Sequence, residues 1–203
     1  MSTSSRRKRT YHHGDLVPAL LAEAGKVLEE EGLDALTLRE VARRVGVSHN
    51  APYRHFPDRE ALLAALAAEG FGQLAERQRE AAAEKGVRGM GEAYVQFALG
   101  QPQRFQLMFG GAVRIDRHPR LADVATRTFD ALSGALAGAS PASRGAADAS
   151  VAAWALVHGL AHLLKDGRIS PAALAGRDRA QYVRDVLGTL RFATGPAQPG
   201  NGG

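Results

Sequence analysis

Two histidines, His158 and His162, stand four residues apart and follow Trp154 at the same spacing, in a segment that reads as one helix. Side chains at this spacing share a helix face, so the imidazoles could bind a divalent metal ion, with His118 or Asp166 as a third ligand. No glutamate stands at a spacing typical of a hydrolase, and the chain has no cysteine. We therefore expect packed or interfacial histidines and no metal, and keep an all-α metal-dependent hydrolase using His158 and His162 as an alternative function.

A second group of polar side chains, between residues 49 and 55, has the chemistry of nucleic-acid recognition. Asparagine can form two hydrogen bonds with adenine, and arginine can pair with guanine or with a phosphate. The group consists of His49, Asn50, Tyr53, Arg54 and His55. An ordinary helical corner in an all-α core is the alternative interpretation of this stretch.

A run of cations precedes the first expected helix, within a segment (residues 1–13) that we predict to be a flexible basic arm. Such arms lie along phosphates or enter the minor groove of DNA. Beside a DNA-reading motif we favour this contact over the alternative, a solvated tail that aids solubility. The cations are Arg6, Arg7, Lys8 and Arg9.

Composition favours binding over catalysis. The formal charge of +5 and a pI near 10.0 favour polyanionic partners. The chain has no phosphate-cradling glycine loop, no nucleophile elbow and no paired-carboxylate signature, so we expect neither an enzyme nor a cofactor.

The absence of cysteine fits a reducing compartment, and no window approaches the roughly 20 apolar residues that cross a bilayer. We expect a cytoplasmic protein with no membrane partner.

The elements that carry these residues read as helices throughout, which predicts an all-α fold. An apolar stripe predicts a helix over 15–31, which Asp15 caps and Gly32 ends. Thr37 and Glu40 form a capping box at the start of the next helix, in which Glu40 reaches back to the backbone at Thr37. Gly46 should end that helix, and Ser48 should cap another within two residues, so that the pair forms a helix-turn-helix.

Pro52 lies inside the second helix of this pair. As the fourth helical residue it cannot donate a hydrogen bond to the Ser48 carbonyl, so the first turn should be 3₁₀-like or the helix should begin late. Pro52 either fixes how His49 and Asn50 project or is merely tolerated.

Later elements follow from prolines, caps and composition. Asp58 should cap a long helix that Gly86 ends, Pro102 and Pro119 should each begin a helix, and the last ten residues should be disordered. The expected later helices are 59–85, 102–109, 119 to about 138, 144–165 and 177–192.

The residues around the turn resemble the DNA-binding domain of the TetR/AcrR family of bacterial transcriptional regulators. The resemblance rests on TLREVA (37–42), GVS (46–48), YRHFP (53–57) and EALL (60–63). It implies a three-helix domain over residues 14–58, whose third helix reads the major groove while a homodimer binds double-stranded operator DNA with an inverted repeat.

The same resemblance assigns roles to individual residues. It makes Thr37 and Tyr53 phosphate contacts, places His55 near the DNA backbone and makes Phe56 a core residue. Where the family commonly has a lysine aimed at phosphate, this chain has Arg59, which keeps the charge but changes the geometry. Ser48 and Pro52 complete the predicted DNA-binding set.

Residues 59–193 correspond by resemblance to a helical effector-binding and dimerisation domain, whose last two helices pack against those of a second copy. Trp154, His158 and Gly159 resemble a subgroup with a Trp-x-x-x-His-Gly signature. We predict a pocket for a small, mostly apolar effector, with His158 as its polar handle, although such aromatics are often simply core. Its expected lining is Tyr94, Phe97, Phe105, Met108, Phe109, Phe129, Trp154, His158 and His162.

The function that these features predict is a dimeric repressor, released from its operator by a small-molecule effector. The hydrolase and a non-specific DNA-binding protein are the alternatives.

Overall fold

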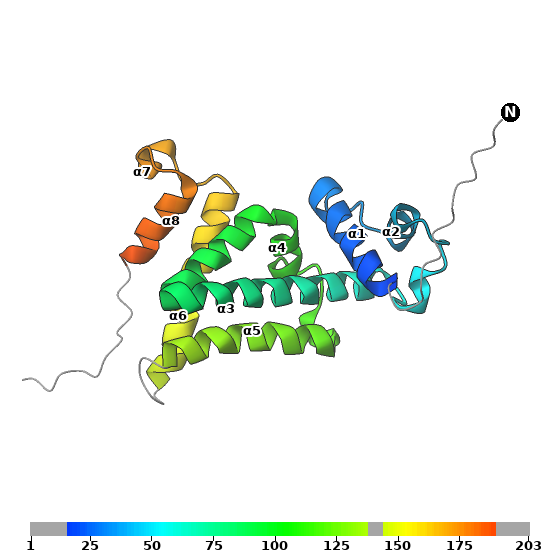
Figure 1. Ribbon diagram of the computed structural model, residues 1–203, viewed down its shortest axis with the longest axis horizontal. Coiled ribbons are helices and arrows are strands. Elements are labelled where there is room, and N and C mark those ends of the chain that lie inside the picture. Colours follow the sequence, from blue (N-terminus) through cyan, green and yellow to red (C-terminus); the bar gives the residue numbers. More distant parts are fainter. Residues whose placement is uncertain (1–15, 138–143, 190–203) are drawn as a thin grey trace, which may run out of the picture. The chain divides into compact units, whose positions relative to one another are not determined.

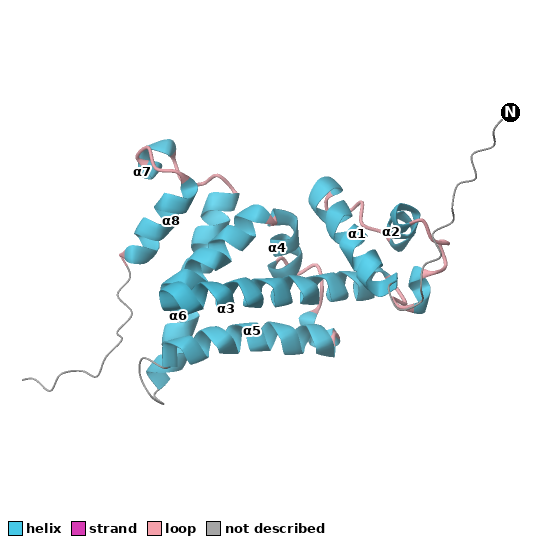
Figure 2. Cartoon of the chain, viewed as in Figure 1, coloured by secondary structure: helices cyan, strands magenta, loops and turns pink. Residues whose placement is uncertain are grey.

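The computed structural model of this protein describes residues 16–137 and 144–189, and these residues form helices, turns and loops without any strand, so the all-α prediction is confirmed (Figures 1 and 2). The α-helices are α1 (Leu16–Glu31), α2 (Leu38–Val45), α3 (Arg59–Gly100), α4 (Pro102–Phe109), α5 (Pro119–Ala137), α6 (Arg144–Lys165), α7 (Pro171–Leu174) and α8 (Arg179–Gly188). Two 3₁₀ turns, η1 (Pro52–Arg54) and η2 (Ile115–Arg117), lie between them. The predicted basic arm, the Asp15 cap and the C-terminal tail lie outside the described residues.

The chain divides into two compact units, one ending at Leu66 and the other beginning at Ala67. The division falls within α3. The first turns of α3 belong to the N-terminal unit, and their side chains at Leu62 and Leu66 are fully buried.

In the N-terminal unit, α1 buries apolar residues spaced three and four apart, among them Leu20, Val27 and Leu28. Gly32 follows the helix with φ 84°, a left-handed conformation that glycine adopts without strain. The predicted end of this helix is confirmed.

Helix α2 begins at its predicted cap and ends at its predicted glycine. Thr37 Oγ1 accepts a hydrogen bond from the Glu40 amide at 3.1 Å, and Gly46 has φ 81°. The prediction that Glu40 bonds back to the Thr37 backbone is wrong. The Glu40 carboxylate accepts instead from Arg43 Nε at 2.8 Å and from Arg44 Nε at 2.9 Å. Each of these bonds joins two ionised groups, whereas the backbone amide of Thr37 is neutral.

The second helix of the helix-turn-helix is shorter than predicted. Only the 3₁₀ turn η1 forms, and the residue before it is Ala51, not the expected cap Ser48. Ser48 contributes its carbonyl oxygen, which accepts from the Ala51 amide at 2.9 Å. The reason is the one anticipated from Pro52, which has no N–H to donate and so forces a late start.

In the C-terminal unit, α3 reverses direction at Gly86, where φ is 58° and ψ is −147°. The predicted helix end at Gly86 corresponds to this break, after which the chain returns to helix as far as Gly100. Close packing of the two arms depends on Gly89, because a Cβ there would lie 2.3 Å from the Ala81 carbonyl oxygen. The reversal brings residues after Gly86 back over the end of the first arm.

Among the later helices, α5 runs alongside the first arm of α3 (Figure 1). Helices α4, α5 and α6 begin where predicted, and Thr128 Oγ1 of α5 lies 3.4 Å from the Phe71 carbonyl oxygen of α3. The predicted helix over 177–192 is corrected to α8, since Asp178 caps it through the Gln181 amide at 2.7 Å and its last helical residue is Gly188. Residues 190–192 lie outside the described part of the chain.

Among the described helices, none has the length and apolar character that crossing a membrane requires.

Candidate functional site

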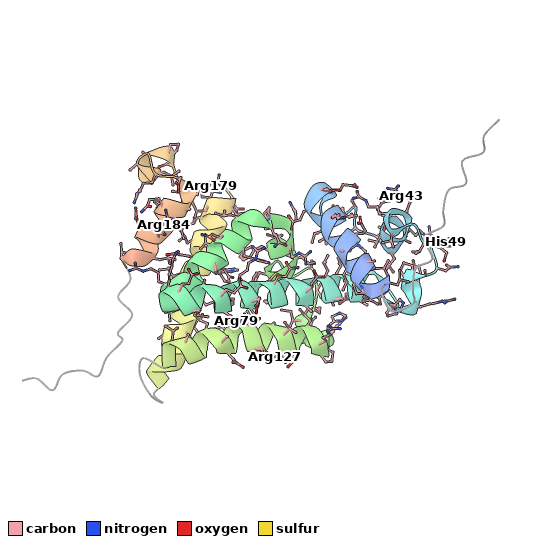
Figure 3. The ribbon with its side chains drawn as sticks, in the orientation of Figure 1. Arg43, His49, Arg79, Arg127, Arg179 and Arg184 are labelled. Carbon is pink, nitrogen blue, oxygen red and sulfur yellow. The ribbon has the colours of Figure 1, made fainter. Side chains whose placement is uncertain are left out.

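The turn between α2 and α3 presents its polar side chains outward. Every one of its predicted DNA-binding residues from Ser48 to His55 is exposed, with Tyr53 keeping 46% of its surface, except for Pro52, which is buried. Figure 3 labels His49 and Arg43 on this unit. The buried proline thus anchors a short segment whose polar side chains face solvent.

Two side chains stabilise the domain around this segment. Phe56 is 6% exposed, which confirms its expected place in the core. Arg44 of α2 donates to Glu30 Oε2 at 2.8 Å and also binds Glu31, so the end of α1 and the end of α2 are tied together. Hydrogen bonds from Arg43 and Arg44 lower the pKa of Glu40 to about 2, so this carboxylate is ionised at neutral pH.

Arg59 is used inside the N-terminal unit. Its Nε donates to the Leu36 carbonyl oxygen at 2.7 Å, and its Nη2 donates to the Leu33 carbonyl oxygen at 2.5 Å. These bonds fasten the loop between α1 and α2 to the start of α3. The phosphate contact of Arg59 stays a prediction, but two nitrogens of its guanidinium already donate to backbone carbonyl oxygens.

Thr37 is suited to its predicted role. Its hydroxyl oxygen accepts from the Glu40 amide while the side chain remains exposed, which leaves the O–H to donate to a phosphate. Helix α2 also exposes Arg39 and Arg43, which sequence reasoning did not single out. Their four-residue spacing was the available signal, because it places them on one helix face.

The C-terminal unit contains a cavity of about 430 Å³, within the range of ligand pockets. Four of the residues predicted to line a pocket do so, namely Tyr94, Phe109, Phe129 and Trp154. The other lining residues, which sequence reasoning missed, are Phe71, Leu74, Gln78, Val87, Arg88, Gly91, Ile115, Ala125, Thr126, Thr128, Leu132, Ala153, Val157 and Leu187.

The other aromatic candidates lie in the core beside the cavity. Phe97 and Phe105 are fully buried, and Met108 packs closely against α3 at Gly70, where a Cβ would lie 2.7 Å from its sulfur. Neither they nor His158 and His162 are among the lining residues.

The predicted polar handle, His158, is bound within the protein. Trp154 Nε1 donates to the Tyr94 hydroxyl oxygen at 3.3 Å, and that hydroxyl lies 2.8 Å from His158 Nδ1. Indole is only a donor, so the tyrosine oxygen accepts from Trp154, and its O–H is left to donate to an unprotonated Nδ1 of His158. Burial and the neighbouring His162 lower the pKa of His158, and burial raises that of Tyr94. We assign His158 as the neutral Nε2–H tautomer.

The histidine pair does not gather a metal-binding set. The ring centroids of His158 and His162 are 4.7 Å apart, and His162 Nδ1 lies 4.0 Å from Asp166 Oδ2. In the described part of the chain, no three side chains of His, Cys, Asp or Glu are grouped so that they could hold a metal ion.

Comparison with known families matches both units. Residues 20–66 match the bacterial regulatory proteins of the tetR family, and residues 87–190 match the Tetracyclin repressor-like, C-terminal domain. The first match contains the exposed turn, and the second contains most of the cavity wall.

Individual proteins agree with these matches. The HTH-type transcriptional regulator Rv1816 of Mycobacterium tuberculosis is 30% identical over 135 residues, which cover 60% of this chain and 58% of that protein. The chain therefore spans less than two thirds of this curated relative.

Solved structures share the fold over nearly the whole chain. A protein with unknown function from Rhodococcus sp. RHA1 is 34% identical with a TM-score of 0.74, over 94% of this chain and 100% of that one. The TetR family transcriptional regulator PfmR from Thermus thermophilus has 17% identity and a TM-score of 0.61, also over 94% and 100%.

Proposed function

Because the chain belongs to the TetR family of bacterial regulatory proteins, we propose that it is a sequence-specific DNA-binding transcriptional regulator, and specifically a repressor that a small-molecule effector releases from its operator. The observation that carries the proposal is the exposed turn after α2. There a buried proline and a buried phenylalanine support a row of solvent-facing groups that can reach bases and phosphates.

The proposed division of labour follows the chemistry of each side chain. Asn50 has the donor and acceptor needed to read adenine, whereas Tyr53, Arg54 and Thr37 suit phosphate oxygens. The basic arm and the boundaries of the DNA-binding and effector domains, 14–58 and 59–193, are part of the same proposal.

The regulator acts as a homodimer on an inverted repeat. Helix α6 leaves Val151 and Leu163 exposed, at 53% and 48% of their surface, which supports its use against a second copy. Trp154, His158 and Gly159 fall within the matched C-terminal domain and support membership of the subgroup with that signature. Operator binding also sets the location, since the protein must share the bacterial cytoplasm with DNA.

Selection of fragments from a sheared source genome by the purified protein, at near-physiological salt, tests this function. We expect a few sites that share an inverted repeat. Uniform, salt-labile recovery would instead favour a non-specific DNA-binding protein.

Two matched arginine variants then locate the interface. Arg54→Ala should weaken binding to every sequence and reduce the slope of affinity against salt, whereas Arg79→Ala, an exposed arginine of α3 labelled in Figure 3, should leave both unchanged. Asn50→Ala should mainly relax sequence preference at one base position, with a loss of about 1–3 kcal/mol on the operator. Equal losses on operator and random DNA would count against base reading by Asn50.

A further inference from the structure

The cavity of the C-terminal unit has mostly apolar walls, built from aromatic and aliphatic side chains. Its aromatic residues are Phe71, Tyr94, Phe109, Phe129 and Trp154, and its aliphatic residues come from α3, η2, α5, α6 and α8. Such walls favour a compact apolar body over a hydrated one. The few polar groups in the wall must then decide what else the ligand carries.

Most of these polar groups already have partners. The Tyr94 hydroxyl is held between Trp154 Nε1 and His158 Nδ1. Thr128 Oγ1 donates to the Val124 carbonyl oxygen at 2.8 Å, so its proton is used within α5. Neither hydroxyl therefore has a proton to offer a ligand.

Arg88 is the charged residue of the cavity wall. The lining contains neither Asp nor Glu, and no carboxylate among the described residues pairs with this guanidinium. The buried Glu92, one turn along the same helix, is bound by Lys85 at 3.0 Å and does not line the cavity. The sequence of residues 190–203 contains no Asp or Glu that could pair with Arg88.

The guanidinium lies at the end of the cavity formed by α8. A Cβ at Gly188 would lie 3.8 Å from Arg88 Nη2, and the neighbouring Leu187 is itself part of the wall. Arg88 remains exposed, so pairing with a ligand there would not require a buried charge. An apolar body inside the cavity could thus place an anionic group beside this arginine at its mouth.

From this arrangement we propose that the cavity selects an apolar organic anion, such as a ring-bearing carboxylate, and that Arg88 is the residue that determines this preference. The inference rests on the proposed function, because it names the class of effector. It also runs against cationic ligands, because Arg88 would repel them and the wall has no carboxylate to offset that repulsion.

A competing explanation is that Arg88 is only a solvated arginine beside the C-terminal end of α8, where a cation is mildly favourable. That arrangement would stabilise the fold without discriminating between ligands. The two explanations differ in how ligand charge affects affinity.

Three ligands of one shape separate them, namely adamantane-1-carboxylate, the neutral adamantane-1-carboxamide and the cation 1-(aminomethyl)adamantane. Trp154 is the single tryptophan of the chain and lines the cavity, so its emission reports occupancy directly. We expect the carboxylate to bind about tenfold more tightly than the amide, consistent with one charge-assisted hydrogen bond, and the cation to bind most weakly.

Arg88→Gln should remove the preference for the carboxylate over the amide. Arg179→Gln makes the same change of net charge away from the cavity and should preserve the preference. Ala125→Phe, which fills part of the wall, should weaken all three ligands. Equal affinities for the three ligands, no binding of any, or a preference that survives Arg88→Gln would overturn the proposal.

DNA binding by the same preparation is measured separately. Binding to selected operator fragments together with charge-blind ligand binding would refute the ligand class and leave the regulator intact. Arg88-dependent carboxylate binding in a protein without operator specificity would uphold the ligand class and refute the proposed function.

Discussion

The hydrogen-bonded chain from Trp154 through Tyr94 to His158 predicts the effect of a single oxygen atom. In Tyr94→Phe the ring keeps its place, since the side chain is 3% exposed and packs edge-on against Phe105 with centroids 5.7 Å apart. The hydroxyl is lost, so Trp154 Nε1–H and His158 Nδ1 both lose their partner. The loss of stability should come from these two unsatisfied groups, because the packing of the ring does not change.

The magnitude follows from their surroundings. A typical hydrogen bond contributes about 1 kcal/mol to stability, and an unsatisfied buried group costs about 1–3 kcal/mol. The bond to His158 is short, at 2.8 Å, and the bond to Trp154 is long, at 3.3 Å, while both partners are only half-buried. We expect a loss of about 2 kcal/mol in the free energy of unfolding, or about 4–8 °C in Tm for a chain of this size.

Urea denaturation followed by circular dichroism measures this loss, and the emission of Trp154 reports the local change in the folded state. Tyr182→Phe is the matched control, because the Tyr182 ring stacks on the Arg177 guanidinium at 4.9 Å and this contact does not use the hydroxyl. The control should lose at most about 0.5 kcal/mol. If Tyr94→Phe were no more destabilising than Tyr182→Phe, the assigned hydrogen-bonded chain would be refuted.

Three other outcomes follow from the described residues. Gly46→Ala should cost about 1 kcal/mol in urea denaturation because φ is 81° there, whereas Gly72→Ala, in a helix with open space around it, should be neutral or stabilising. Arg59→Gln removes the charge and cannot bridge both loop carbonyls as arginine does, so stability should fall by about 1–2 kcal/mol while the salt slope of DNA binding stays constant; a reduced slope would mean that Arg59 binds phosphate. Burial and His162 lower the pKa of His158, so its contribution to stability is present above pH 6.5 and is lost as pH falls from there towards the folded-state pKa; denaturation at several pH values should show a flatter profile for His158→Gln.

Local chemistry made much of the fold predictable. Helices α4 and α5 begin at prolines and α2 begins at a capping threonine, and each of these signals acts within one turn of helix. The break at Gly86 and the 3₁₀ turn at Pro52 were predictable for the same reason, since both follow from the backbone of one residue. The fate of the Glu40 carboxylate was less predictable, because several donors lay within its reach.

The cavity could be predicted only in part. Aromatic side chains in helices 87–100, 102–109, 119–137 and 144–165 indicated an apolar pocket, but the same residues also suit a packed core. Phe105 and Phe109 are four residues apart on one short helix, yet the first is fully buried and the second lines the cavity. What separates them is where the neighbouring helices end, and spacing along one helix carries no information about that.

The sequence by itself determined the all-α class, the exposed polar turn of the DNA-binding domain and most helix starts, because these depend on caps, prolines, glycines and apolar periodicity within a few residues. Tertiary structure alone decided that Arg59 serves the loop carbonyls, that His158 is bound to Tyr94, and that Arg88 stands at the mouth of an otherwise uncharged cavity. Each of these pairs residues from separate helices or loops. Which residues become neighbours depends on the path of the chain between them. For Arg88 this path includes the reversal of α3 at Gly86 and the return of α8 to the side of Arg88.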